Sequence, residues 1–182
     1  MLNSSFKDLA KISIIGHPAV GKTTILNLLT ENKIEKTYIP TQGFDLKTIK
    51  GEDNNFNYNF KIWDFGGQKV YLNYLEDYLV GSDLVFIVTD STALNVLNSK
   101  ELIKRASNII EEDCPLIAIA NKQDLCKSDG RLDEKLVEDI LQIKTYGLTA
   151  TNPSERLKLV TIIQNELNQI LTRRMRLKKD EV

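Results

Sequence analysis

Residues 16–23 read GHPAVGKT, a match to the pattern G-x-x-x-x-G-K-[ST] that constrains the fold of this chain more than any other feature. The run before it, residues 11–15 (KISII), is short, apolar and rich in β-branched side chains, as in a buried strand. The run after it, residues 23–30 (TTILNLLT), carries leucines at helical spacing. The chain must therefore turn sharply from a strand into a helix, and the glycines permit that turn.

This strand–loop–helix arrangement predicts a phosphate site, because the backbone amides that open a helix have no intrahelical partner. Lys22 can reach terminal phosphates, and the Thr23 hydroxyl can ligate Mg²⁺. A nucleoside triphosphate with Mg²⁺ is therefore the expected ligand. The residues expected to line its phosphates are Gly16, Ala19, Val20, Gly21, Lys22, Thr23 and Thr24. The competing interpretation, a chance glycine-rich turn, is weakened by the strand before it and the helix after it.

Length and composition predict one ordinary globular domain of 182 residues. The formal net charge of −1 provides no field that would attract nucleic acid. No apolar run approaches the roughly 18 residues of a membrane span, and no secretory pattern opens the chain. His17 is the single histidine, which argues against a His-based catalytic triad or a multi-His metal site. Cys114 and Cys126 lack metal-binding spacing and are expected to be reduced structural thiols.

Apolar strand-like runs alternate with helix-like runs along the chain, which predicts a doubly wound α/β fold. The expected strands are residues 11–15, 44–49, 56–63, 84–89, 116–120 and 143–148. The expected helices are residues 23–30, 70–79, 96–112, 132–141 and 154–171.

Two details of this assignment are testable. Residues 44–49 and 56–63 are expected to pair as an antiparallel hairpin, with a solvated Asn-rich turn between them. The last helix is expected to bury one face. The residues expected on this buried face are Leu157, Val160, Ile163, Leu167 and Ile170.

The segment 63–68 (WDFGGQ) follows a strand-like run and therefore falls at the edge of the sheet where ligands bind. Asp64 can hold Mg²⁺ through a water molecule. Gly67 can present its amide to a γ-phosphate, and Gln68 can orient an attacking water. Taken alone, this segment is equally well explained as a strand-ending turn, but its distance after the phosphate loop favours a site.

The segment 121–124 (NKQD) follows another buried run and indicates which base is bound. One carboxylate, Asp124, can accept both the N1–H and the N2 amine of guanine, whereas adenine presents an acceptor there. Lys122 can lay its stem over the base plane, and Asn121 can tie loops together. In isolation this segment would be an ordinary charged loop.

Two weaker signals complete the set. Thr41, in a loop before the second strand, could join the Mg²⁺ shell when a γ-phosphate is present, or it could belong to a Pro-Thr turn. Thr149 and Ala150 follow the last expected strand, and their backbone could contact the base.

These elements, in this order, resemble the Ras-like small GTPases, and the segments GKTT (21–24), IPTQGF (39–44), WDFGGQ (63–68) and NKQDL (121–125) resemble the Arf/Arl branch. The resemblance covers residues 11–171, with a short extension before it and a basic tail, 172–182, after it. It implies a mostly parallel six-stranded sheet with one antiparallel strand. It also implies a monomeric GDP/GTP switch with Mg²⁺ that acts through exchange factors, activating proteins and effectors in trafficking or another membrane-linked process.

Departures from the family pattern shape three further expectations. Residue 2 is Leu rather than Gly and the last residues include no Cys, so neither N-myristoylation nor prenylation is expected. The expected location is the cytoplasm, with peripheral membrane contact through the basic segment 173–179 as an alternative to a solvated helix end. Pro18 removes one amide from the loop and could crowd the place where an activating protein's side chain enters.

The sequence has no arginine before Arg105, which predicts slow intrinsic hydrolysis. An arginine supplied by an activating protein would then add roughly 10³- to 10⁵-fold in rate. Two alternatives stay open. One is a regulatory or scaffold subunit locked with GTP, which Gln68 argues against; the other is an ATPase or small-molecule kinase, which Asp124 disfavours.

Overall fold

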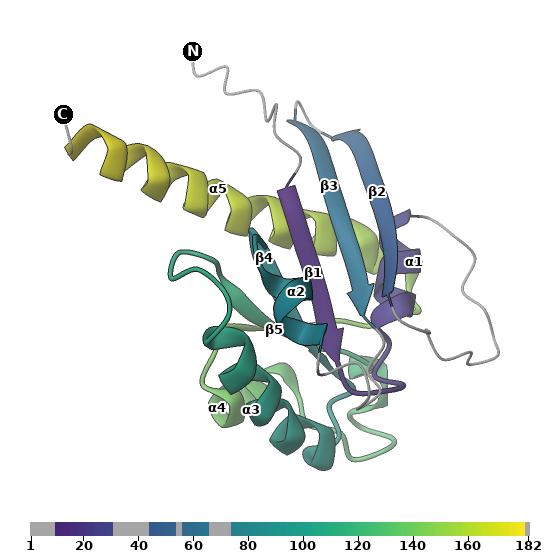
Figure 1. Cartoon of the computed structure of the whole chain (residues 1–182). Coiled ribbons are helices and arrows are strands. Elements are labelled where there is room, and N and C mark those ends of the chain that lie inside the picture. Colours follow the sequence, from purple (N-terminus) through teal and green to yellow (C-terminus); the bar gives the residue numbers. More distant parts are fainter. Residues whose placement is uncertain (1–9, 31–43, 54–55, 66–73, 181–182) are drawn as a thin grey trace.

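The computed structural model describes residues 10–30, 44–53, 56–65 and 74–180, and these residues form a six-stranded sheet flanked by helices (Figure 1). The strand order is β2-β3-β1-β4-β5-β6. Neighbouring strands pair in parallel from β3 to β6, whereas β2 runs antiparallel to β3. The strands are β1 (Ala10–Gly16), β2 (Phe44–Asp53), β3 (Phe56–Phe65), β4 (Leu84–Thr89), β5 (Leu116–Ala120) and β6 (Thr145–Gly147). The α/β class expected from the alternating pattern is confirmed.

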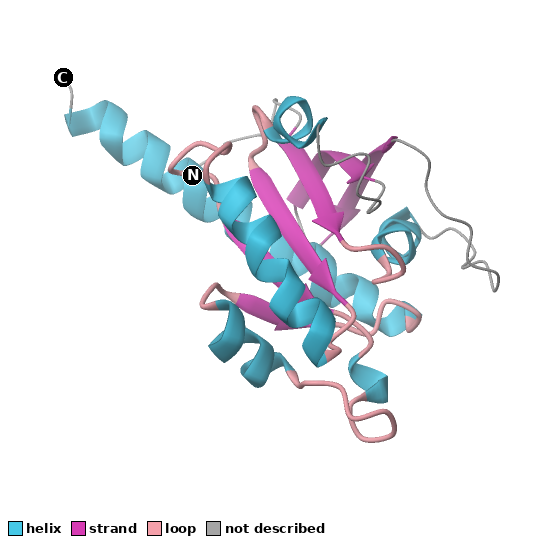
Figure 2. Cartoon of the chain, turned by 60° about the horizontal axis from the view of Figure 1, so that its bottom comes forward, coloured by secondary structure: helices cyan, strands magenta, loops and turns pink. Residues whose placement is uncertain are grey.

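Helices of the α and the 3₁₀ type precede or follow most of these strands. Figure 2 shows the helices in cyan around the magenta strands. The α-helices are α1 (Lys22–Thr30), α2 (Leu75–Leu79), α3 (Ala93–Ser107), α4 (Glu134–Leu141) and α5 (Arg156–Asp180). The short 3₁₀ helices η2 (Gln123–Leu125) and η3 (Pro153–Glu155) follow β5 and β6.

The central strands β4 and β5 are almost wholly apolar because helices cover both of their faces. All six residues of β4 are buried. Alternate residues face opposite layers: Phe86 packs in the cluster that includes α1 and α5, whereas Val85 and Ile87 pack in the cluster that includes α2 and α3.

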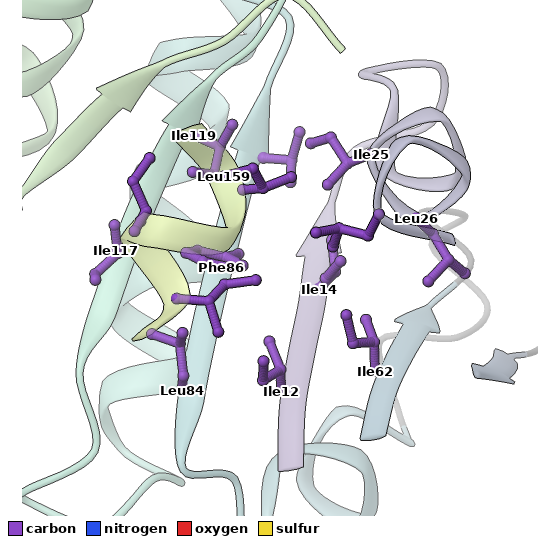
Figure 3. Packing of buried hydrophobic residues seen from close by; sticks show 14 of the residues in the cluster. Ile12, Ile14, Ile25, Leu26, Ile62, Leu84, Phe86, Ile117, Ile119 and Leu159 are labelled. Carbon is purple, nitrogen blue, oxygen red and sulfur yellow. The ribbon is translucent and has the colours of Figure 1, made fainter. Parts of the chain in front are cut away.

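The larger layer lies between the sheet, α1 and α5 (Figure 3). Figure 3 shows Ile12 and Ile14 of β1 among the side chains of the neighbouring strands and of both helices. Ile25, Leu26 and Leu159 are each 0% exposed. Burial of a side chain of this size stabilises a fold by about 1.5–3 kcal/mol, so this layer fixes where α1 begins relative to β1.

Several expected boundaries are corrected by the structure. The first hairpin strand runs on to Asp53 and the second starts at Phe56, so residues 50–53 are strand where the turn between 44–49 and 56–63 is expected from the sequence. α3 begins at Ala93, where the Thr92 side chain accepts a hydrogen bond from the Asn95 backbone N–H, and it ends at Ser107. Residues 70–73 of the expected helix at 70–79 lie outside the described residues, and α2 begins at Leu75.

The expected buried face of α5 is wrong at one position, because Leu157 is 54% exposed. Leu159 and Ile162 are buried in its place, together with Val160, Ile163, Leu167 and Ile170. At about 100° per residue, Leu157 lies far from the centre of this stripe. The helix also continues to Asp180, so residues 172–180 are helical rather than a separate tail, and Figure 1 shows this end of α5 extending beyond the sheet.

β6 forms one edge of the sheet, and side chains satisfy part of its outer backbone. The Thr145 N–H donates to Glu138 Oε2 at 2.9 Å, and Lys158 Nζ donates to the Gly147 oxygen at 2.7 Å. Nearby, Glu166 of α5 is 4% exposed and its Oε1 accepts from Lys144 Nζ at 2.5 Å and from the Tyr146 hydroxyl at 2.8 Å. Such contacts limit pairing with another strand and join this edge to α5.

Among the described residues, no helix combines the length and the apolar character that crossing a bilayer requires.

Candidate nucleotide-binding site

The loop between β1 and α1 is a close-fitting backbone turn at the carboxyl edge of the sheet (Figure 1). A Cβ atom on Gly16 would overlap the main-chain oxygen of Val88 in β4. Gly21 has φ of +102°, and a Cβ atom there would overlap the side-chain nitrogen of Asn121. Glycine is thus required at both ends of the loop by packing, and at Gly21 also by conformation.

Lys22 lies beneath this loop and is 6% exposed. Its Nζ donates to the Gly16 oxygen at 3.1 Å and to the His17 oxygen at 2.9 Å. The ammonium group therefore lies on the inside of the turn, where its positive charge could attract an anion bound by the loop amides. Thr23, the next residue, is exposed in the first turn of α1.

Asn121 connects the phosphate loop with two other loops and is 2% exposed. Its Nδ2 donates to the Val20 oxygen at 2.9 Å, and its Oδ1 accepts from the Ala150 N–H at 3.0 Å. Its own backbone N–H donates to the Thr89 oxygen at 2.8 Å. The structure thus joins three of the sequence-predicted segments through one buried amide.

Lys122 and Asp124 follow directly and face the same region. Lys122 adopts a left-handed backbone with φ of +63°, and its Nζ donates to the Ala19 oxygen at 2.9 Å. Asp124 is exposed, and its backbone N–H donates to the Thr149 hydroxyl at 3.2 Å. The carboxylate of Asp124 is therefore carried on a backbone that is fixed to the loop after β6.

A recess of about 130 Å³ opens between these segments. The residues that line it are Gly21, Thr24, Asn121, Lys122, Asp124, Leu125, Ala150 and Thr151. Pockets for whole drug-sized ligands usually measure about 300–1,000 Å³, so this recess has room for one part of such a ligand.

Of the other predicted site residues, the structure describes the position of some and not of others. Asp64 lies near the end of β3, where its Cα is the register partner of Ile14 in β1, two residues before Gly16. Thr41, Gly67 and Gln68 lie outside the described residues.

Sequence reasoning missed three residues that support the segment 121–124. Ser91 has φ of +65° and its hydroxyl donates to the Asn121 oxygen at 2.7 Å. Asp90 and Arg131 form an ion pair of 3.2 Å behind Lys122. Asp90 could have been found by the signal that identified Asp64, a carboxylate at the carboxyl end of a buried apolar run.

Comparison with known proteins agrees with this geometry. The family model described as the Ras of Complex, Roc, domain of DAPkinase matches residues 11–124. ADP-ribosylation factor-like protein 3 of Chlamydomonas reinhardtii is 38% identical over 120 residues, which cover 64% of this chain and 64% of that protein. ADP-ribosylation factor-like protein alp41 of Schizosaccharomyces pombe is 29% identical over 140 residues, 75% of this chain and 70% of that protein. The chain belongs to the Ras-like GTPase family, on its Arf-like branch.

The likeness of this Arf-like domain to other family members extends beyond that branch. The GTP-binding nuclear protein GSP1 of Encephalitozoon cuniculi is 29% identical over 138 residues, which cover 75% of this chain. The domain spans 64% of the length of that protein and of the Chlamydomonas relative. Guanine-nucleotide binding is what such a family leads one to expect of the recess beside Asp124.

Proposed function

We propose that this Arf-like domain binds GDP and GTP with Mg²⁺, hydrolyses GTP slowly, and acts as a molecular switch that signals through effectors. The observation that carries the proposal is the double contact of Asn121 with Val20 and Ala150. The contact to Val20 spans 101 positions of the sequence. It holds the loop expected to bind phosphate, 16–23, next to the segment expected to bind guanine, 121–124.

The phosphate end of the ligand would lie on the amides of the loop residues 19–24. Lys22 already lies along the inside of this turn, so rotation of its side chain would exchange two carbonyl contacts for phosphate oxygens. The tight packing of Gly16 and Gly21 leaves the backbone itself as the contact surface, as a phosphate cradle requires.

The base end would lie in the recess beside Asp124. The Asp124 carboxylate would accept both guanine donors, and the stem of Lys122 would cover one face of the purine. The backbone of Thr149 and Ala150 would contact the base as well. An adenine nucleotide would leave the carboxylate facing an acceptor, which disfavours it strongly.

The donor set also fits a divalent cation of the Mg²⁺ type, which prefers oxygen ligands. Thr23 would supply a hydroxyl, Thr41 a second one, and Asp64 a carboxylate acting through water. Mg²⁺, when bound, would neutralise charge on the β- and γ-phosphates.

Hydrolysis would depend on Gln68, which would orient the attacking water, while Gly67 would donate its amide to the γ-phosphate. Because no arginine precedes Arg105, the charge that develops on the phosphates would be stabilised by Lys22, the loop amides and Mg²⁺, without an arginine from the switch regions. An activating protein would then supply an arginine, and an exchange factor would release GDP. We propose a monomer in the cytoplasm that regulates trafficking or another membrane-linked process.

The deciding experiment is chromatographic identification of the nucleotide released when freshly purified protein is denatured. GDP would support a switch that has turned over. GTP would support instead either a subunit locked in the GTP form or a switch with a strict need for an activating protein. An adenine nucleotide, or protein that takes up no Mg²⁺-GTP after stripping, would overturn the proposal. Gln68→Leu should then keep GDP binding but slow single-turnover hydrolysis, and equal rates in the two proteins would reject the role of Gln68.

A further inference from the structure

Asp90 is a nearly buried carboxylate just after the end of β4, and one of its oxygens accepts hydrogen bonds only from residues close by in the sequence. It is 9% exposed. Its Oδ1 accepts from the Thr92 backbone N–H at 3.1 Å, from the Thr92 hydroxyl at 2.8 Å and from Asn95 Nδ2 at 2.8 Å. These three donors fix the plane of the carboxylate relative to the first turn of α3.

The second oxygen of Asp90 faces two cations that come from later in the chain. Arg131 Nη1 lies 3.2 Å from Oδ2, and Lys122 Nζ lies 3.8 Å from it. Arg131 also donates to the Asp90 main-chain oxygen at 2.6 Å and pairs with Asp129 at 2.9 Å. The Arg131 side chain is 11% exposed, so the guanidinium covers this side of the carboxylate.

The charge of Asp90 is maintained despite its burial. Burial by itself acts to raise the pKa of this carboxyl, but hydrogen bonds from Asn95 and Thr92 and the charge of Lys122 together hold it below its ordinary value. A permanent negative charge thus lies beside the Lys122 ammonium.

Lys122 is consequently held between two fixed points. Its Nζ donates to the Ala19 oxygen of the phosphate loop on one side and faces Asp90 on the other. Its backbone is in the left-handed region, which a lysine adopts only when its surroundings impose it. The Gln123 side chain links the same segment to Ser91 at 2.9 Å and to the Leu132 oxygen at 3.2 Å, next to Arg131.

We propose that Asp90 and Arg131 are positioning residues that hold Lys122 across the guanine recess and thereby set how long the nucleotide stays bound. This inference rests on the proposed guanine-nucleotide site. Asp90 acts by attracting the Lys122 ammonium, and Arg131 acts on Asp90 by shielding it from water. Neither residue lines the recess itself.

A double-mutant cycle tests the inference, because it isolates the part of the Asp90 effect that passes through Lys122. The rate of release of a fluorescent GDP analogue is measured for wild type, Asp90→Asn, Lys122→Ala and the double variant. Asp90→Asn should accelerate release about tenfold in the wild-type background and less than about twofold once Lys122 is absent. An equal acceleration in both backgrounds, or none in either, would overturn the inference.

Arg131 provides a second line of test should Asp90→Asn fold poorly. Arg131→Ala should accelerate release by about three- to tenfold and Arg131→Lys by less, because Lys keeps the charge but loses the planar fork. Arg105→Ala is the matched control: its pair with Glu101 is exposed, and release should not change. Equal release rates in Arg131→Ala and the control would count against the inference.

The outcomes separate this inference from the function on which it rests. Wild-type protein that binds no guanine nucleotide would remove both. Tight GDP binding by wild type together with additive effects in the cycle would leave the proposed function intact and remove only the role of Asp90 and Arg131.

Discussion

The side-chain nitrogen of Asn121 lies 2.9 Å from the main-chain oxygen of Val20, and this contact joins the phosphate loop to the loop after β5. The amide is 2% exposed, so few other partners are available to either group. Two loops that the sequence separates are therefore one structural unit.

Asn121→Ala should destabilise the fold by about 1–3 kcal/mol, because it leaves the buried Val20 oxygen and the Ala150 N–H without their partner. Nucleotide release should become faster in the same variant. Urea unfolding checks the first effect. Asn168→Ala, at an exposed position of α5, is the matched control and should stay within about 0.5 kcal/mol of wild type. A loss of stability no larger than that of the control would contradict the role of Asn121 in holding these loops together.

Gly21→Ala should prevent tight nucleotide binding and cost more than about 2 kcal/mol of stability, since the new methyl would meet Asn121 at a positive φ. Gly81 and Gly130 are controls with φ of +71° and +61° and open space around them. Their alanine variants should lose only the backbone term, about 1–2 kcal/mol, with GDP affinity unchanged. Titration calorimetry with GDP on nucleotide-free protein measures the affinity of each variant. A Gly21→Ala protein that binds GDP as tightly as these controls would rule out a phosphate site that depends on Gly21.

Asp124→Asn should weaken guanine preference and admit xanthine nucleotides, because the amide can donate to the xanthine O2 that replaces the guanine amine. Competition between GTP and XTP measures this preference directly. The fold should be unaffected, since the Asp124 side chain is exposed and its backbone contact to Thr149 remains. An unchanged ratio of GTP to XTP affinity would show that another residue selects the base.

Asp90 should contribute stability in a pH-dependent way. Its pKa is held below the ordinary 3.8, so its contribution is complete above that pH and is lost as the pH falls through the folded-state value. The difference in unfolding free energy between wild type and Asp90→Asn should therefore be constant near neutrality and shrink below about pH 4. Denaturant titrations between pH 3 and 7 measure it. A difference that grows on acidification would mean that the charged form is not the stabilised one.

Glu166→Ala should destabilise the protein by about 1–3 kcal/mol, because Lys144 and Tyr146 both donate to this buried carboxylate. The hydrogen bond from Lys144 also raises the pKa of that ammonium, so this pairing persists at neutral pH and is lost only as the pH rises above 10.5. Glu101→Ala breaks an exposed pair with Arg105 and should cost less than about 0.5 kcal/mol. Thermal unfolding compares the two variants, and equal losses would show that burial adds nothing to the Glu166 contacts.

Much of the site could be predicted from the sequence, because its signals are local. A phosphate loop needs glycines at fixed spacing, and Asn121 and Asp124 follow a buried apolar run, 116–120, that could only be an interior strand. The meeting of these segments at one edge follows from the parallel strands, whose carboxyl ends lie together.

The structure had to supply what depends on distant partners. Asp90 and Arg131 are 41 positions apart, and no periodicity connects them. The same holds for Glu166, which belongs to a residue type that is seldom buried and which the structure buries against β6.

The sequence by itself determined the α/β class, the succession of strands and helices along the chain, and the segments that make up the candidate site. These depend on short-range spacing and on the apolar content of single elements. The tertiary structure alone decided that Leu157 of α5 is exposed while Leu159 and Ile162 are buried, and which groups lie behind Lys122. Packing and ion pairing are set by which surfaces meet, and that is fixed only when the whole sheet and its helices come together.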